Sequence, residues 1–88
     1  MSHRVQIFST TYCPYCVGAK ALLAQRRIPF EDIDVTDDAE ARARLVRLTG
    51  GRRTVPQIFL DGVPIGGYQE LRELDRRGQL VSMTGLAA

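Results

Sequence analysis

The chain has 88 residues and a net charge of +2, from 12 Lys and Arg against 10 Asp and Glu. Hydrophobic residues make up 44% and charged residues 25%, which excludes a disordered chain and predicts a single small domain over residues 1–88. So small a net charge does not indicate nucleic-acid binding, and no apolar run approaches the roughly 20 residues that a membrane span needs.

The first half of the chain alternates strand-like and helix-like segments. Residues 4–8 and 30–35 alternate and are rich in β-forming residues, so both are predicted to be strands. A helix is predicted between them, from Pro14 to about Arg27, because proline suits the first helical position. Its inner face is formed by residues at helical spacing, namely Cys16, Ala19, Leu22 and Leu23. A strand, a helix and a strand in this order predict two parallel strands joined by a right-handed crossover.

A second helix is predicted over residues 38–49. Asp37 and Glu40 resemble a capping box at its start, and Gly50-Gly51 ends the apolar repeat. Its buried face is expected to carry Ala41, Leu45 and Leu48.

The rest of the chain predicts a hairpin and a third helix. Residues 57–60 and 63–65 are expected to pair as antiparallel strands, because Asp61-Gly62 between them is a strong signal for a two-residue turn. Pro64 indicates that the second of these strands lies at an edge of the sheet. The third helix is expected over residues 68–77, with Leu71 and Leu74 inward and Gly78 as its end. No regular element is expected in the tail, residues 79–88, although Leu80 is expected to pack against the core.

The predicted order β-α-β-α-β-β-α gives a four-stranded mixed sheet covered by helices, an α/β domain of the thioredoxin-like kind. The only two cysteines, Cys13 and Cys16, are too few for the disulfide-rich scaffold of a small secreted protein. The first residues also lack the charged and then apolar pattern of a secretory signal. We therefore expect a cytoplasmic protein, and in that reducing compartment a close cysteine pair is more often metal-binding or redox-active than structural.

Three uses of this cysteine pair differ in their physical support. A structural zinc site needs four ligands, and His3 is the only other Cys or His in the chain. A disulfide between Cys13 and Cys16 would close too short a loop to constrain the unfolded chain strongly. Thiol–disulfide chemistry has a direct physical reason and is therefore the use that we expect.

The predicted helix start gives the two cysteines different roles. With Pro14 as the first helical residue, Cys13 is the N-cap, and its sulfur lies at the positive end of the helix dipole. This position favours an anion, so the Cys13 thiol is expected to ionise more readily than a free thiol and to attack disulfides. Cys16 lies on the buried face and is expected to resolve the resulting mixed disulfide.

Four segments resemble the glutaredoxins, specifically the small dithiol type common in bacteria. They are Cys13-Pro14-Tyr15-Cys16, residues 19–23 (AKALL), residues 54–59 (TVPQIF), and Gly66-Gly67 ahead of Glu70-Leu71. These segments occur in the order and spacing of the family and span nearly the whole domain. The resemblance implies glutathione-dependent reduction of protein disulfides and of glutathione mixed disulfides. It implies glutathione as a co-substrate, with no bound cofactor and no metal.

The resemblance also assigns residues to glutathione, namely Tyr15, Arg52, Thr54, Val55, Pro56, Gly67, Tyr68 and Gln69. In the family, the proline of the TVP segment is cis and lies beside the nucleophile, and the preceding backbone pairs with the cysteine of glutathione. The helix start after the two glycines receives the γ-glutamyl carboxylate, which agrees with the anion preference of a helix N-terminus.

Two positions depart from the family pattern. Thr10 stands where a lysine is usual, and Gln69 stands where an aspartate or serine is usual. Arg52 or Arg53 is a candidate for the missing positive charge, because a guanidinium matches the glycine carboxylate of glutathione. The alternative is that both arginines belong to a solvated cluster at the end of the second helix.

Two further functions remain open for the same fold. One is a redoxin that takes electrons from thioredoxin reductase and donates them to ribonucleotide reductase. The other is a carrier of a [2Fe–2S] cluster held by two chains and two glutathiones, although cluster-binding members mostly have a smaller residue than Pro14 at that position. The expected partners are glutathione and disulfide-containing or glutathionylated proteins, with ribonucleotide reductase as one candidate. We expect a monomer without nucleic-acid or membrane partners.

Overall fold

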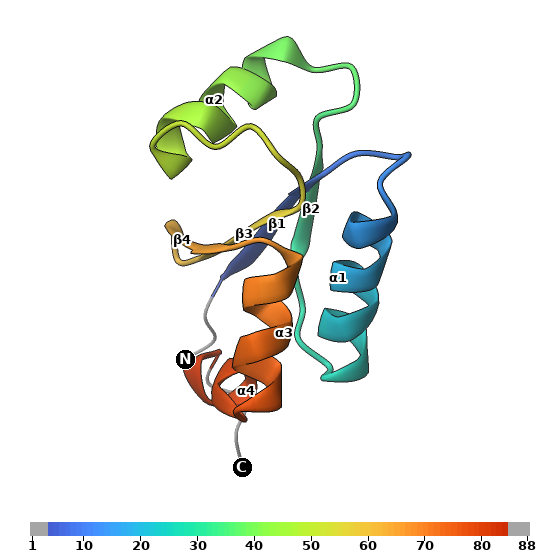
Figure 1. The fold of residues 1–88 in the computed structure, drawn as a ribbon, viewed down its shortest axis with the longest axis vertical. Coiled ribbons are helices and arrows are strands. Elements are labelled where there is room, and N and C mark those ends of the chain that lie inside the picture. The colour runs from blue at the N-terminus through green and yellow to red at the C-terminus, as the bar shows by residue number, and fades with distance from the viewer. Residues whose placement is uncertain (1–3, 85–88) are drawn as a thin grey trace.

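The structure is a computed structural model, and it describes residues 4–84 (Figure 1). Its elements are β1 (Val5–Ser9), α1 (Pro14–Gln25), β2 (Glu31–Asp34), α2 (Ala39–Thr49), β3 (Gln57–Leu60), β4 (Val63–Gly66), α3 (Tyr68–Arg76) and α4 (Gln79–Met83). The four strands form one sheet in the order β2-β1-β3-β4. The predicted order of strands and helices is confirmed, and the short helix α4 is added to it.

The sheet is mixed in the predicted way. β1 and β2 are parallel, whereas the β1–β3 and β3–β4 pairs are antiparallel. The turn between β3 and β4 is formed by Asp61 and Gly62, whose φ angles of 51° and 84° suit a tight two-residue hairpin. Pro64 lies in β4, which is at the edge of the sheet and pairs with a strand on one side only. A proline, which has no backbone N–H group to donate, is tolerated at such an edge.

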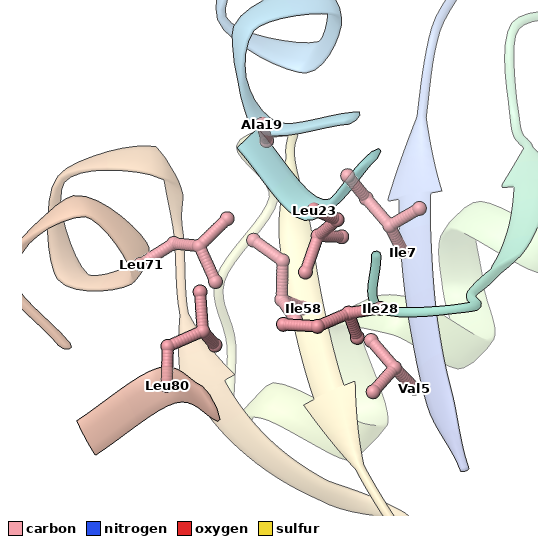
Figure 2. Close-up of a cluster of buried hydrophobic side chains, with 8 residues drawn as sticks. All are labelled: Val5, Ile7, Ala19, Leu23, Ile28, Ile58, Leu71 and Leu80. Atoms are coloured by element: carbon pink, nitrogen blue, oxygen red, sulfur yellow. The ribbon is translucent and has the colours of Figure 1, made fainter. Parts of the chain in front are cut away.

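Helices cover both faces of the sheet. α1, α3 and α4 pack on one face, over a cluster whose buried members are Val5, Ile7, Ala19, Leu23, Ile28, Ile58, Leu71 and Leu80 (Figure 2). α2 packs on the other face, where Phe8, Val35, Leu45 and Phe59 are buried together. The alternation along β1 explains this division, because Val5 and Ile7 point to one face and Phe8 to the other. Among residues 4–84, none of the helices combines the length and hydrophobicity that crossing a bilayer requires.

Two predictions for α2 are wrong. The N-cap is Asp38, whose carboxylate accepts a hydrogen bond from the Ala41 N–H group at 2.9 Å, and the helix starts one residue later than predicted. Either of two adjacent aspartates can cap a helix, so the sequence pattern does not choose between them. Leu48 was predicted to be buried, but it is 43% exposed. Helical spacing identifies the apolar face but not how far along the helix that face is covered.

The prediction of a tail without regular structure is also wrong for its first residues. Gly78, with a φ of 73°, separates α3 from α4. Leu80 on α4 is buried as predicted, and the Thr84 hydroxyl donates a hydrogen bond to its carbonyl oxygen at 2.9 Å. A helix of 5 residues is too short to show a readable period, so packing rather than pattern defines it. The remainder of the predicted tail, residues 85–88, and His3 lie outside the described residues.

Candidate active site

The N-terminus of α1 is capped by a sulfur. Pro14 is the first helical residue, and the preceding Cys13 has the extended backbone of an N-cap, with φ −100° and ψ 111°. The Cys13 Sγ accepts a hydrogen bond from the Cys16 N–H group at 3.3 Å. The first turn of α1 contains no acidic residue that would oppose a negative charge there. This arrangement places a backbone N–H donor and the positive end of the helix dipole at the Cys13 sulfur.

Cys16 lies in a different environment, because its side chain is fully buried on the inner face of α1. The pKa of its thiol is raised from 9.0 to about 11, first by burial and then by the hydrogen bond with the Cys13 side chain. A backbone hydrogen bond from Thr10 acts in the opposite direction. Cys16 is therefore a neutral thiol at physiological pH. An accessible attacking sulfur and a protonated buried sulfur are what a dithiol mechanism requires.

A groove of about 300 Å³ opens beside Cys13. It is lined by Tyr15, Arg52, Thr54, Val55, Pro56, Gln57, Gly67, Tyr68, Gln69 and Glu70. All the residues that the resemblance assigns to glutathione are in this set. They come from three separate segments, which are the start of α1, the loop before β3 and the start of α3. The Cys13 Sγ lies 3.6 Å from the Val55 carbonyl oxygen, so the thiol adjoins the edge of the groove.

The loop before β3 brings its polar groups to the groove. The peptide bond between Val55 and Pro56 is cis, as the resemblance implies. The Gln57 Nε2 donates a hydrogen bond to the Thr54 Oγ1 at 3.2 Å. Gln57 is only 2% exposed, and its Oε1 has no hydrogen-bond partner among residues 4–84. Gln57 was not among the predicted site residues, although a polar residue at the start of an otherwise apolar strand is a signal that points to it.

The start of α3 forms the opposite wall. Gly67 is its N-cap, and no side chain caps the helix there. A Cβ atom on Gly67 would lie 3.2 Å from the Pro56 carbonyl oxygen. A Cβ atom on Gly66, which has a φ of 114°, would lie 2.7 Å from the Glu70 Cγ. The two glycines therefore allow α3 to begin close against the loop that carries Pro56.

The groove lining contains an ion pair between Arg52 and Glu70. The Arg52 Nη2 lies 3.3 Å from the Glu70 Oε1, and both side chains are about half exposed. Burial alone would raise the pKa of Glu70, but backbone N–H groups of Glu70 and Gly67, together with Arg52, hold it below its usual value. The sequence left open whether Arg52 or Arg53 faces the groove, and in the structure only Arg52 lines it. Glu70 was not among the predicted site residues.

Thr10 contributes to the site through its backbone rather than its side chain. It is 3% exposed and does not line the groove. Its Oγ1 has no hydrogen-bond partner within the described part of the chain. The backbone of Thr10 contacts the Cys16 thiol instead. Arg52 is the one positively charged side chain among the residues that line the groove.

Comparison with known proteins agrees with this geometry. The family model described as glutaredoxin matches residues 5–65. The chain is 38% identical to glutaredoxin 1 of Rickettsia felis over 79 residues, which cover 89% of this chain and 78% of that protein. It is 42% identical to glutaredoxin 3 of Escherichia coli over 76 residues, covering 86% and 90%.

A solved relative carries the same fold. The crystal structure of a buckwheat glutaredoxin–glutathione complex superposes with a TM-score of 0.85 at 35% identity, covering 98% of this chain and 83% of that one. Fold, dithiol pair and relatives agree with what the sequence predicted. The chain belongs to the glutaredoxin family, and it is a glutathione-dependent thiol–disulfide oxidoreductase with a Cys-x-x-Cys active site.

Proposed function

We propose that Cys13 is the nucleophile of this glutaredoxin, that Cys16 is its resolving thiol, and that glutathione binds in the groove beside Cys13. The observation that carries the proposal is the position of that groove, which opens next to the one sulfur that caps a helix. The buckwheat protein was crystallised in complex with glutathione, which supports a glutathione site in this fold.

The groove offers a partner for each polar part of glutathione. Arg52 suits the glycine carboxylate, because a guanidinium and a carboxylate form paired, charge-assisted hydrogen bonds. The backbone of Val55 suits the central cysteine, since strand-like pairing holds a peptide without reading its side chain. The first N–H groups of α3, at Tyr68 and Gln69, suit the γ-glutamyl carboxylate. Tyr15, Thr54 and Pro56 border the groove around these contacts.

The reaction with a glutathionylated protein needs only Cys13. The Cys13 thiolate attacks the glutathione sulfur, a disulfide forms between Cys13 and glutathione, and the protein leaves as a thiolate that takes up a proton. A second glutathione, as its thiolate, then attacks the glutathione sulfur of this intermediate. Oxidised glutathione leaves, and the Cys13 thiolate is restored. Cys13 attacks the glutathione sulfur of the mixed disulfide rather than the protein sulfur, because the groove binds the glutathione part and leaves the protein outside.

Reduction of a protein disulfide needs both cysteines. Cys13 attacks one sulfur and is joined to the protein, and Cys16 then loses its proton and attacks the Cys13 sulfur. The protein leaves with two thiols, and the Cys13–Cys16 disulfide is reduced by two molecules of glutathione, which become oxidised glutathione. We propose that the protein does this as a cytoplasmic monomer acting on disulfide-containing or glutathionylated proteins.

The proposal is tested by turnover of a glutathione mixed disulfide in the presence of glutathione, glutathione reductase and NADPH. Cys13→Ser is expected to reduce turnover to the uncatalysed rate, because no other thiol caps the helix. Cys16→Ser is expected to keep much of the activity on the mixed disulfide and to lose the reduction of a protein disulfide. Full activity of Cys13→Ser would show that the nucleophile is assigned wrongly. Equal losses of both activities in Cys16→Ser would show that the two routes are not separate.

A further inference from the structure

Gly18 lies in the middle of α1, where glycine is a poor helix former. Its backbone does not require glycine, because it is not among the residues with positive φ. The requirement comes from a neighbour instead. A Cβ atom on Gly18 would lie 3.1 Å from the Cε1 and 3.2 Å from the Cζ of Tyr68, which is closer than ordinary van der Waals contact. The absent side chain therefore leaves room for the ring of the first residue of α3.

That ring stacks between two other side chains. The centroids of the Tyr68 and Tyr15 rings are 5.9 Å apart, with their planes inclined by 41°. The Arg72 guanidinium lies over the Tyr68 ring, with its Cζ 5.7 Å from the centroid. Tyr15 is 64% exposed, and within residues 4–84 Tyr68 is the aromatic ring that contacts it. The position of this exposed ring therefore depends on where Tyr68 lies.

The Tyr68 ring also stands between two cavities. One is the groove beside Cys13, which Tyr15 and Tyr68 both line. The other is a cavity of about 690 Å³ between α1 and α3, which Gly18, Tyr68 and Arg72 line. A side chain at residue 18 would compete with the ring for the same space. Displacing the ring would change the wall of the groove although the substituted residue itself does not line it.

We propose that Gly18 is a positioning residue for glutathione binding, because it admits the Tyr68 ring that holds Tyr15 at the wall of the groove. This inference rests on the proposed glutathione site. It adds a residue on the side of α1 that faces α3, outside the groove lining, that sets the affinity of the groove for glutathione. The reactive sulfur is left unaffected, because Gly18 lies outside the hydrogen bonds that surround Cys13.

The first experiment compares Gly18→Ala and Gly18→Leu in the coupled assay. Gly18→Leu is expected to raise the KM for glutathione roughly threefold to tenfold, the range that loss of one aromatic contact implies. Gly18→Ala is expected to give a smaller rise, because the ring needs to move by only a few tenths of an ångström. The kcat at saturating glutathione is expected to stay within about twofold. Val17→Leu, on the same helix at a 62% exposed position, is the matched control and should change neither constant.

The second experiment introduces Gly18→Leu into a Tyr68→Ala variant, which lacks the tyrosine ring at residue 68. In a Tyr68→Ala background, Gly18→Leu is expected to have no further effect on the KM, because the space it needs is already empty. It is also expected to raise the midpoint of thermal unfolding, since leucine is the better helix former. The chain has no Trp and 3 Tyr, so the near-ultraviolet circular dichroism band of tyrosine arises from Tyr12 and from the Tyr15–Tyr68 pair, and Tyr12 is the same in every variant compared. Gly18→Leu should change this band in the parent protein and leave it unchanged in the Tyr68→Ala background.

Three results would overturn the inference. These are an unchanged KM in Gly18→Leu, an unchanged tyrosine band, or equal effects of Gly18→Leu with and without the Tyr68 ring. Arg52→Gln separates this failure from failure of the proposed site. If Arg52→Gln raises the KM for glutathione and Gly18→Leu does not, only the role of Gly18 is wrong. If neither change affects the KM, glutathione does not bind in this groove.

Discussion

The N-termini of α1 and α3 border the same groove, but they are capped in opposite ways. α1 begins with Cys13, whose own sulfur accepts the N–H group of Cys16. α3 begins with Gly67, which has no side chain to cap the helix. Both helix starts favour a negative charge. At α1 the N-cap sulfur occupies this position. At α3 the Glu70 carboxylate interacts with the N–H groups of Gly67 and Glu70, and the N–H groups of Tyr68 and Gln69 are left for the carboxylate of a bound molecule.

This difference separates reactivity from recognition. The sulfur at α1 is part of the chain, so it lies at this helix start whether or not a ligand is bound. The open start of α3 acts only when a ligand is present, and it therefore determines affinity. A change at one helix start should affect mainly the chemistry, and a change at the other should affect mainly binding. The following predictions test that separation, from the largest expected effect to the smallest.

The largest expected effect is the pH dependence of the buried cysteine. The pKa of Cys16 is raised from 9.0 to about 11, so at pH 7 only about one molecule in ten thousand carries this thiolate. The unfolded chain loses this proton near pH 9 and the folded chain near pH 11, so this group destabilises the fold as the pH rises through that range. The ¹³Cβ shift of Cys16 in Cys13→Ser protein should titrate well above pH 9. A midpoint at or below pH 8.5 would show that burial does not control this thiol.

The next effect is on stability at the start of α3. Gly66→Ala is expected to destabilise the fold by about 1–3 kcal/mol, because a φ of 114° suits glycine and the new Cβ atom would collide with Glu70. Gly51→Ala is the matched control, since its φ is 116° but its Cβ atom would meet no atom within 4 Å. Chemical denaturation should show the larger loss for Gly66→Ala. Equal losses would mean that the close approach of Glu70 contributes nothing beyond the backbone angle.

A smaller effect is expected on binding at the groove. Arg52→Gln should raise the KM for glutathione about threefold to tenfold and leave the kcat nearly unchanged, because a charge-assisted hydrogen bond is lost from binding alone. Arg53→Gln is the control, since Arg53 does not line the groove. The difference between the two variants should shrink as salt is added. A large fall in kcat for Arg52→Gln would contradict the separation between the two helix starts.

The smallest effect is expected at Thr10. Its buried Oγ1 has no hydrogen-bond partner among the described residues, so Thr10→Val removes an unsatisfied polar atom and keeps the shape of the side chain. The free energy of unfolding should stay within about 0.5 kcal/mol of the parent value or increase, and turnover should be unchanged. Thr36→Val is the contrasting change, because the Thr36 Oγ1 accepts a hydrogen bond from the Thr11 N–H group at 2.9 Å. A greater loss of stability at Thr10 than at Thr36 would refute this account.

The fold was predictable because its strongest local signals agree with one another. Asp61-Gly62 strongly favours a tight turn, Pro14 favours the first position of a helix, and the alternation in β1 divides the two faces of the core. α4 and the exposure of Leu48 were not predictable, because both depend on how far other elements extend over the surface.

The site was predictable only in part, for a related reason. The motifs identified the residues that the resemblance assigns to glutathione, and those residues line one groove. Gln57 and Glu70 lie within the segments that resemble the family but were not predicted to be site residues, and Gly18 belongs to none of these segments. Gln57 contacts Thr54, Glu70 contacts Arg52, and Gly18 lies against Tyr68. These pairings are visible only in the three-dimensional structure. A single sequence shows the type of each of these residues but not its neighbour.

The central claim is that glutathione bound to Cys13 lies in the groove between the two helix starts. The most direct test is an isotope-filtered NMR experiment on labelled Cys16→Ser protein after reaction with unlabelled oxidised glutathione. Our account predicts one glutathionyl group on Cys13, with nuclear Overhauser contacts from glutathione to the amide of Val55 and to Tyr68. A glutathionyl group that makes no contact with either residue would contradict it.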